Sequence, residues 1–313
     1  MNSKLKFFPI ILSLLIVSGL FAVIAYKKNN SKQKNPEHIF FTGEFDKQKT
    51  CRRSPRFLQR LHIRQPIVID LSQQRFTGIV FYHGQRLEKT LHAKRWEKYG
   101  SFGTYSLDEQ GNLYLAPIPH ISIGSDTFEW QKNIYRLDSV TGDLSVVMHF
   151  DDVSPNPKNP YGIQSLVYDC DDKTLWVSAI DETDFQTQKG VIYHIDPETK
   201  QILQRVSGFD ALTITLLHTT EAKYLLAGSA VDDGLYAYLI VDGKISSKPV
   251  KLFELSKANN HIRKIKIRGK NYLELQAIPF SYTLIAQTTK QYRNIFNAKW
   301  DTLVSQWTVA LKK

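Results

Sequence analysis

Short apolar runs separated by turn residues make up most of the chain from residue 67 onward. One module occurs at least twice, as NIYRLDSVTGDL at residues 133–144 and as VIYHIDPETKQI at residues 191–202. Each copy follows a further strand-like run, NLYLAP at residues 112–117 and TLWVSA at residues 174–179. A repeated unit of strand, hairpin, strand, long loop, strand, turn and strand is typical of one blade of a β-propeller.

The number of blades follows from the strand-like runs around the repeated module. Five blades are visible, and six are possible if residues 38–66 or the insertion after Pro117 contain further strands. The last region has one run too many for a blade and the first region has one too few, so the two chain ends could complete one blade together. No long amphipathic helix pattern follows residue 66, which disfavours an α/β fold. We therefore expect an all-β fold, a five- or six-bladed β-propeller over residues 63–313.

An uncharged apolar segment precedes the expected propeller. Residues 7–26 carry no charge, and the short stretch before them, residues 1–6, is basic. These 20 residues, at about 1.5 Å each, match a hydrocarbon core of about 30 Å, which predicts a transmembrane signal anchor. A cleavable signal peptide usually has a shorter apolar core, although Val23-Ile24-Ala25 offers a weak cleavage site. Residues 27–62 are polar and basic, as expected of a linker.

Two opposing signals bear on the side of the membrane. Four lysines follow the apolar segment, and a count of flanking positive charges would leave the C-terminal domain in the cytoplasm. An N-terminal signal followed by one large domain is instead the usual plan of an exported protein. We expect a propeller that is extracytoplasmic, periplasmic or extracellular, and that is anchored in the membrane through residues 7–26, or secreted if that segment is cleaved.

The positive charge of the chain is concentrated in its N-terminal part. The net charge is +11, and residues 1–66 alone contain 13 Lys and Arg against 3 Asp and Glu. The rest of the chain is therefore close to neutral. Basic residues beside an apolar segment are placed to meet anionic lipid headgroups. This distribution argues against nucleic acid as a partner, and no nucleic-acid-binding module accompanies the basic residues.

The chain contains two cysteines, Cys51 and Cys170. In an exported domain they could form one disulfide that ties the N-terminal tail to the domain. The alternative is two unrelated thiols. Two cysteines are too few to form a thiolate metal site by themselves.

The run YGIQSLVYDCDDKTLWVSAIDE at residues 161–182, with the strands that follow it, resembles blades of the NHL and SMP-30/gluconolactonase-like propellers. Pro160 and Gly162 match their Pro-x-Gly-like opening, Asp169–Asp172 their Asp-rich hairpin, and Leu175–Val177 their second strand. The similarity covers two blades clearly and a third loosely. Propellers of this kind include lactonases, esterase-like enzymes, quinoprotein dehydrogenases and binding scaffolds, so the resemblance implies a fold rather than one activity.

The metal site of the SMP-30-like hydrolases is not carried over to this chain. Those enzymes hold a divalent metal in the central channel with a carboxylate and Asn ligands. Their first carboxylate lies in a Glu-Gly-Pro-like opening, and no such motif occurs here.

Candidate functional residues come from the loops. In a propeller, the loops that lead into the first strand and out of the second strand of each blade usually converge on one mouth of the central channel. The candidates for ligand binding are Asn159, Tyr161, Asp181, Glu182 and Asp210. The acidic loop residues Asp181, Glu182 and Asp184 could hold a divalent cation, Ca²⁺ or Zn²⁺, since Ca²⁺ is bound by oxygen ligands. The alternative is a solvated acidic loop.

Two residues are candidates for catalysis. A His near a carboxylate could act as a general base, which makes His120 and Asp210 the candidates for proton transfer. The alternative for His120 is a surface or packing side chain on a long loop.

Other recurring residues have a structural interpretation. Asp138 and Asp196 each end a strand before a turn, where Asp accepts hydrogen bonds from its own backbone. Tyr135 and Tyr193 are expected to pack between blades. Near the C-terminus, basic residues alternate with isoleucine along HIRKIKIRGK at residues 261–270, and the alternate positions from Lys264 onward share one face of a strand. This pattern indicates an edge guarded by charge or a docking site for an acidic partner.

The absent motifs narrow the function. The chain has no Gly-x-Ser-x-Gly elbow, Walker loop, His-Glu-x-x-His or Cys-x-x-Cys motif. We expect a scaffold that binds a small molecule or a protein partner at the channel, without catalysis. The alternative is a metal-dependent lactonase or esterase-type hydrolase in the SMP-30 style, in which Asp181, Glu182 and Asp210 help to hold a metal that polarises a carbonyl or activates water. A quinoprotein-like dehydrogenase ranks third, because the channel positions lack the basic cluster expected to meet quinone carboxylates.

Overall fold

The computed structural model of the chain describes residues 41, 44–46, 51–52, 54–71, 75–118, 128–156, 159–181, 183, 187–256, 259–282 and 292–312. The chain divides into two compact units, Met1–Glu37 and His38–Lys313, and all the described residues belong to the second. Residues 7–26, the expected membrane anchor, lie outside them. Within the described ranges, no helix has the length and hydropathy that a membrane crossing requires.

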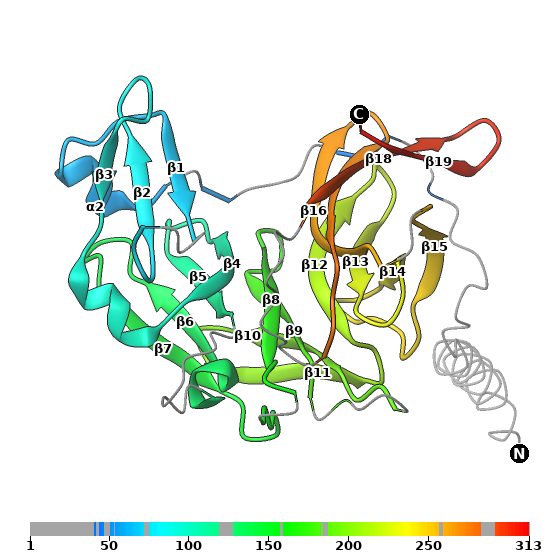
Figure 1. The fold of residues 1–313 in the computed structure, drawn as a ribbon, viewed down its shortest axis with the longest axis horizontal. Coiled ribbons are helices and arrows are strands. Elements are labelled where there is room, and N and C mark those ends of the chain that lie inside the picture. The colour runs from blue at the N-terminus through cyan, green and yellow to red at the C-terminus, as the bar shows by residue number, and fades with distance from the viewer. Residues whose placement is uncertain are drawn as a thin grey trace, which may run out of the picture. The chain divides into compact units, whose positions relative to one another are not determined.

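Five antiparallel sheets follow one another along the chain (Figure 1). Sheet 1 contains β1 (Ile67–Asp70), β2 (Val80–His83) and β3 (Lys89–Leu91). Sheet 2 contains β4 (Phe102–Leu107), β5 (Leu113–Pro117), β6 (Asn133–Leu137) and β7 (Leu144–His149). Sheet 3 contains β8 (Ile163–Asp169), β9 (Thr174–Ala179), β10 (Val191–Asp196) and β11 (Gln201–Ser207).

Sheets 4 and 5 complete the fold. Sheet 4 contains β12 (Ala211–His218), β13 (Lys223–Ser229), β14 (Gly234–Ile240) and β15 (Val250–Glu254). Sheet 5 contains β16 (His261–Gly269), β17 (Tyr272–Ile278), β18 (Asn294–Asp301) and β19 (Gln306–Leu311). Among the described residues, three short helices lie outside the sheets, namely α2 (Arg56–Arg60), η1 (Lys94–Tyr99) and η2 (Phe128–Lys132).

The five sheets are the blades of a β-propeller. Strands that are neighbours in sequence are neighbours in each sheet, and the innermost strands β4, β8, β12 and β16 contact one another in that order. The prediction of an all-β propeller with five or six blades is confirmed, with five sheets and no sixth among the described residues. The prediction that both chain ends complete one blade is wrong for the described strands, because β19 pairs with β18 and sheet 1 keeps three strands.

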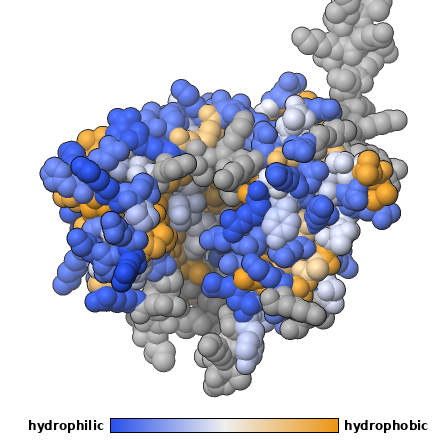
Figure 2. Space-filling model, turned by 90° about the horizontal axis from the view of Figure 1, so that it is seen from above, coloured by the Kyte–Doolittle hydropathy of each residue, from blue (hydrophilic) through white to orange (hydrophobic). Residues whose placement is uncertain are grey.

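Hydrophobic clusters join consecutive sheets. The blades bury apolar side chains on both faces because each is stacked between neighbours, and all residues of β5 and β9 are buried. Four clusters join sheets 1 and 2, 2 and 3, 3 and 4, and 4 and 5, and they contain Trp96, Tyr193, Tyr238 and Leu275 respectively. Among the described residues, no such cluster joins sheet 5 to sheet 1. Figure 2 looks down on the side where these two sheets lie and shows a hollow between the two halves of the molecule.

Each inner strand of the four-stranded sheets contains a bulge near its first residue. The pairing register shifts between Phe102 and Thr104, and at the matching position of the other three inner strands. The extra residues are Gly103, Gln164, Leu212 and Arg263. Since a bulge redirects a side chain, these four residues mark one level of the central channel.

Part of the segment expected to be a linker packs onto the propeller. Phe41 lies against Trp300 and Trp307 of sheet 5, and Phe57 of α2 packs against Trp96. Between Phe41 and Phe57, the chain passes the turns that connect the first and second strands of sheets 5, 4, 3 and 2. The contacts at these four turns are, in that order, the hydrogen bond from Phe45 N to Asn271 Oδ1, the hydrogen bond from Asp46 N to His218 O, the Cys51–Cys170 disulfide, and the contact of Arg52 with Gly111. We call the described residues from 41 to 60 the N-terminal strap.

The repeated Asp and Tyr residues have the structural roles expected of them. Asp138 Oδ1 accepts the N–H groups of Val140 and Thr141, and Asp196 Oδ1 accepts those of two residues in its own turn. Tyr135 and Tyr193 are fully buried in the clusters between blades. These interpretations are confirmed, and the repeat marks the fold rather than the site.

Candidate functional site

The propeller has two unlike ends. The inner strands start at one end, where the loops between the second and third strands also lie, and we call this the mouth end. They run to the opposite end, which carries the turns between first and second strands, and we call this the turn end. The residues that the sequence predicted for ligand binding come from loops of the mouth end.

A hydrogen-bond network at the mouth end connects loops of sheets 3 and 4. Asn159 Nδ2 donates to the carbonyl oxygen of Thr183 at 2.9 Å, and Thr183 Oγ1 donates to Asp210 Oδ1 at 2.9 Å. In the same region Asp181 Oδ1 accepts the N–H of Ser154 at 2.9 Å. Three predicted residues, Asn159, Asp181 and Asp210, therefore lie in one region, and Thr183 connects them although the sequence did not single it out.

Asp210 is a buried carboxylate held by neutral donors. It is 0% exposed, and it accepts hydrogen bonds from Thr183 Oγ1, the N–H of Gly190 at 2.7 Å and Tyr282 Oη at 2.5 Å. No Lys or Arg pairs with it among the described residues. Burial raises its pKa, against the opposing effect of the three hydrogen bonds. A side chain at position 190 would collide with it, because a Cβ there would lie 2.3 Å from Asp210 Oδ1.

Aromatic side chains line the same region. Tyr161 donates its hydroxyl to the carbonyl oxygen of Ser281 at 3.1 Å, and its ring lies 5.0 Å from that of Phe280. The Phe280 ring lies 5.3 Å from that of Tyr282. These three rings pack against buried Ile180, Leu212 and Ala230. Burial raises the pKa of Tyr161 to about 12, so its hydroxyl stays neutral and keeps the proton that it donates to Ser281.

Arg263 extends from the bulge of β16 into the central channel. Its Nη1 donates to the carbonyl oxygen of Leu212 on β12, and its Nη2 would lie 3.2 Å from a Cβ at Gly103 on β4. The guanidinium therefore lies among the inner strands of three sheets. The side chain is half-buried, desolvation lowers its pKa, and the nearby Tyr161 opposes that shift. Among the described residues, no carboxylate pairs with it.

Two buried polar atoms on the inner strands also lack a hydrogen-bond partner among the described residues, namely Thr104 Oγ1 and His261 Nδ1. His261 Nε2 lies 4.0 Å from Asp233 Oδ1, which itself accepts the N–H of Asn260 at 2.7 Å. Unsatisfied buried polar atoms are rare in folded proteins. Thr104 and His261 lie within two residues of the bulges at Gly103 and Arg263, so a ligand beside Arg263 could complete their hydrogen bonds.

The sequence could not separate Arg263 from its basic neighbours. Strand alternation places Lys264 and Lys266 on one face and Arg263 on the other, and nothing in the alternation marks Arg263 as a residue of the channel. The signal that would identify it is the bulge, which recurs at the same position in the other inner strands.

The predicted metal and catalytic residues are only partly within the described residues. Glu182, Asp184 and His120 lie outside them. Asp181 and Asp210 each accept hydrogen bonds from protein donors. Within the described ranges, one group of side chains has ligand spacing for a metal ion, Asp169, Asp171 and His218 at the turn end, and the ammonium of Lys223 already lies 2.7 Å from Asp169 Oδ2.

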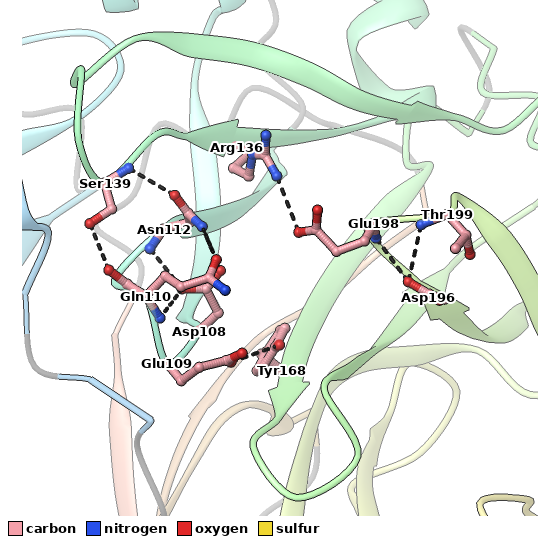
Figure 3. A network of polar contacts seen from close by, with 10 residues as sticks. All are labelled: Asp108, Glu109, Gln110, Asn112, Arg136, Ser139, Tyr168, Asp196, Glu198 and Thr199. Carbon is pink, nitrogen blue, oxygen red and sulfur yellow. Dashed lines mark hydrogen bonds and ion pairs between the residues drawn. The ribbon is translucent and has the colours of Figure 1, made fainter.

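The turn end is closed by satisfied polar contacts. Cys51 and Cys170 are joined in a disulfide with a Cα–Cα distance of 5.4 Å. Figure 3 shows the adjoining network of sheets 2 and 3, in which Tyr168 Oη donates to Glu109 at 2.9 Å and Asn112 Nδ2 to Asp108 at 2.7 Å. These contacts have a structural role, since each charged group shown has its partners within the protein.

Comparisons with known proteins assign neither a family nor an activity to this chain. No family model matches the chain, and no curated protein matches it. Similar solved structures include hydrazine synthase from Kuenenia stuttgartiensis, with 8% identity over 89% of this chain and 68% of that one and a TM-score of 0.45. They also include a Bacteroides fragilis protein described as exported, with 9% identity over 90% and 78% of the two chains and a TM-score of 0.42.

A third similar structure is a glucose dehydrogenase, with 15% identity over 67% of this chain and 72% of that one and a TM-score of 0.36. At these values none of the three carries an argument about the activity of this chain. The expected resemblance to NHL and SMP-30-like blades is supported at the level of the β-propeller fold, and no family model shows membership of either family.

Proposed function

We propose that this chain is a membrane-anchored, extracytoplasmic β-propeller that binds a small organic anion at the mouth end of its channel. The observation that supports this proposal is the Arg263 guanidinium, which lies in the channel without a carboxylate partner among the described residues. Burying a charge without a partner costs free energy. A ligand carboxylate or phosphate compensates that cost, and the guanidinium fork suits both groups because it donates two parallel hydrogen bonds.

The surroundings of Arg263 favour a ligand with an anionic group and an organic body. Tyr161 and Phe280 supply an aromatic wall, and His261 Nδ1 supplies a further unsatisfied polar atom. Binding sites for small molecules commonly combine such a wall with a few oriented polar groups. A protein partner that presents a carboxylate side chain to the same guanidinium is the second form of this proposal.

Calorimetric titration of the purified full chain tests the proposal. The probes are citrate, gluconate and inorganic phosphate, with glucose as the uncharged control. We expect at least one anion to bind, and Arg263→Gln to weaken it by roughly 10- to 100-fold, the value of a hydrogen bond to a charged group. The matched control is Arg268→Gln, which removes a guanidinium from the other end of the same strand. It should leave the affinity for the anion unchanged. Equal affinity of the wild-type chain and Arg263→Gln would overturn the proposal.

The location of the propeller has separate support. Residues 7–26 have the length and hydropathy of a membrane span, and disulfides persist in oxidising compartments outside the cytoplasm. A reporter fused after Lys313 should be active only outside the cytoplasm. Labelling of both thiols in the folded, unreduced protein would contradict the disulfide and with it this part of the proposal.

A metal-dependent hydrolase is the second candidate function, and the observation that favours it is the fully buried carboxylate of Asp210 at the mouth end, which neutral donors surround and whose pKa burial raises. A buried carboxylate with a raised pKa is suited to general acid–base chemistry. Purified protein should then contain Ca²⁺ or Zn²⁺, and its melting temperature should fall when a chelator removes the metal. A metal-free chain with no shift on addition of either ion excludes this alternative.

A further inference from the structure

Sheet 5 differs in charge from the rest of the propeller. Residues 259–313 contain 10 Lys and Arg and 2 Asp and Glu, whereas residues 67–258 contain 18 Lys and Arg and 25 Asp and Glu. The net charge of the domain is therefore near zero because an acidic segment, residues 67–258, and a basic segment, residues 259–313, offset each other. A molecule with such a separation of charge is oriented by a charged surface, with sheet 5 toward an anionic one.

The positive charges of sheet 5 lie largely on one face. Lys264, Lys266 and Arg268 alternate along β16, and Lys266 is paired in register with Glu274 of β17. Glu274 is paired with Asn297 of β18, and Lys299 lies two residues further on that face. We call the following residues the basic patch: Lys264, Lys266, Arg268, Lys299 and Lys312.

One carboxylate serves three cations of the basic patch. Glu274 contacts Lys266 at 3.2 Å, Arg268 at 2.9 Å and Lys312 at 3.7 Å. Lys264 and Lys299 have no carboxylate partner among the described residues. Desolvation lowers the pKa of Lys264, and the neighbouring cations Lys266 and Arg293 lower it further. The patch thus carries a surplus of positive charge that an external anion can neutralise.

The other face of sheet 5 is already covered. Ile265, Leu273, Leu275 and Phe296 are buried in the cluster shared with sheet 4. The basic patch lies on the opposite face, which would be stacked against sheet 1 if the described propeller were closed. Lys264, Arg268, Lys299 and Lys312 are exposed, and among the described residues no hydrophobic cluster joins these two sheets.

The turn between β18 and β19 adds exposed apolar side chains. Leu303 is 94% exposed and Val304 is 61% exposed, and the turn follows Lys299 by only a few residues. We call Leu303 and Val304 the apolar tip. Exposed apolar residues beside basic ones are the pattern of surfaces that insert into the headgroup region of a bilayer.

The chain from the expected anchor joins the propeller at this same sheet. Trp300 Nε1 donates to the carbonyl oxygen of Phe41 at 3.1 Å, and Phe41 packs on Trp307. Fourteen residues separate the apolar segment 7–26 from Phe41, and they span at most about 50 Å. Along the chain from the expected anchor, sheet 5 is therefore the first sheet that the described residues contact.

We infer that the basic patch and the apolar tip of sheet 5 dock the propeller on an anionic lipid surface, the surface of the membrane that holds residues 7–26. This inference rests on the anchoring part of the proposed function and is independent of ligand binding at the mouth end. Phospholipid headgroups neutralise the surplus cations, and Leu303 and Val304 enter the interface between headgroups and acyl chains. The acidic remainder of the propeller is held away from the lipid.

Fluorescence of the full chain in lipid nanodiscs tests the inference. An environment-sensitive dye is attached to Leu303→Cys, and the discs contain phosphatidylcholine with or without phosphatidylglycerol. We expect a blue shift and a rise in intensity in the discs with phosphatidylglycerol, and a loss of both at high salt. The same dye on Val140→Cys is the matched control, because Val140 is a 49% exposed apolar residue of sheet 2, and it should not respond.

Charge variants separate the two parts of the docking surface. Lys264→Gln with Lys299→Gln removes the two cations without a carboxylate partner, and each loss should lower the ratio of docked to undocked chain about fivefold. Lys244→Gln with Lys248→Gln on sheet 4 is the control and should change nothing. A dye at position 303 that stays in water in both kinds of disc overturns the inference, and so does docking that is equal with and without phosphatidylglycerol.

The outcomes distinguish this inference from the proposed function. A chain that does not enter discs at all contradicts the anchor. Docking is then measured by flotation of the chain with phosphatidylglycerol vesicles, and absence of flotation overturns the inference as well. A chain that enters the discs but leaves position 303 in water keeps the anchor and loses only the docking surface.

Discussion

The two ends of the propeller are built from the same strands, yet they differ in whether their buried charged side chains have a partner of opposite charge. At the turn end, Lys223 Nζ lies 2.7 Å from carboxylate oxygens of both Asp169 and Asp172. At the mouth end, Arg263 lacks a carboxylate and Asp210 lacks a cation among the described residues. Folding alone explains this contact of the turn end, where the buried carboxylate of Asp169 has its cationic partner. The mouth end retains polar groups that folding leaves unsatisfied, which is the pattern of a site that binds something else.

The N-terminal strap reinforces the same contrast. It crosses the turns of four sheets and is fixed there by Cys51, by Phe41 on sheet 5 and by Phe57 on Trp96. No described segment crosses the mouth end in the same way. The turn end is therefore expected to determine stability and the mouth end to determine ligand binding, and substitutions at the two ends can separate these effects.

The largest expected effect comes from the disulfide. Replacing both Cys51 and Cys170 with Ser opens a loop of 119 residues and should lower the free energy of unfolding by about 4 kcal/mol, because the unfolded chain is no longer constrained. Denaturant unfolding measures this change. Reducing the wild-type protein should have the same effect, and reducing the variant should have none. Anion affinity at the mouth end should stay unchanged, and a loss of affinity equal to that of Arg263→Gln would break the proposed division of roles.

The next effect compares two buried cations. Lys223→Met leaves the fully buried Asp169 without its ammonium partner and should cost about 3 kcal/mol of stability, as is typical when one member of a buried pair is removed. Arg263→Met leaves no carboxylate behind and should change the free energy of unfolding by less than about 1 kcal/mol. We expect any such change to be an increase in stability, because an unpaired buried charge is removed. Denaturant unfolding of the two variants provides the comparison. Equal losses would mean that Arg263 has a structural partner after all.

Sequence alone could predict the propeller because the repeated strands are long, apolar and regularly punctuated. It could also predict that Asn159, Tyr161, Asp181 and Asp210 lie near one another, because propeller loops converge at one end of the channel. The role of Arg263 could not be predicted, since a bulge changes the phase of a strand without leaving a mark in the hydrophobic pattern. The strap escaped prediction for a different reason. Its contacts are single aromatic anchors such as Phe41 and Phe45, and isolated anchors have no periodicity.

The separation of the basic patch from the acidic remainder was also missed at the level of sequence. A net charge taken over the whole domain averages sheet 5 with sheets of opposite sign, and the average is close to zero. The expected edge guarded by charge, or docking site for an acidic partner, lies on β16, which also contributes Lys264, Lys266 and Arg268 to the basic patch. What it lacked was the register that adds Lys299 and Lys312 to the same face, together with the exposed Leu303 beside them.

The smallest effect is a pH dependence with opposite signs at the two ends. Burial raises the pKa of Asp210 in the folded protein, so folding is opposed once this group ionises. Wild-type stability therefore falls as pH rises from the unfolded-state pKa to the raised folded-state pKa. Asp210→Asn keeps an acceptor for the N–H of Gly190 and lacks the charge. Its stability relative to wild type should be lowest in acid, rise through that window and then stay constant up to neutral pH.

Asp138 at the turn end is the matched control for this measurement. The N–H of Thr141 lowers its pKa, with a further contribution from Val140 against a smaller effect of desolvation. Its contribution to stability is thus present above the unfolded-state pKa and lost as pH falls through the lowered folded-state pKa. Asp138→Asn should be less stable than wild type at neutral pH and equal to it in strong acid. Unfolding by urea across a pH series gives both difference curves, and two curves of the same sign would remove the distinction between the ends, because Asp210 would then be a stabilising carboxylate like Asp138.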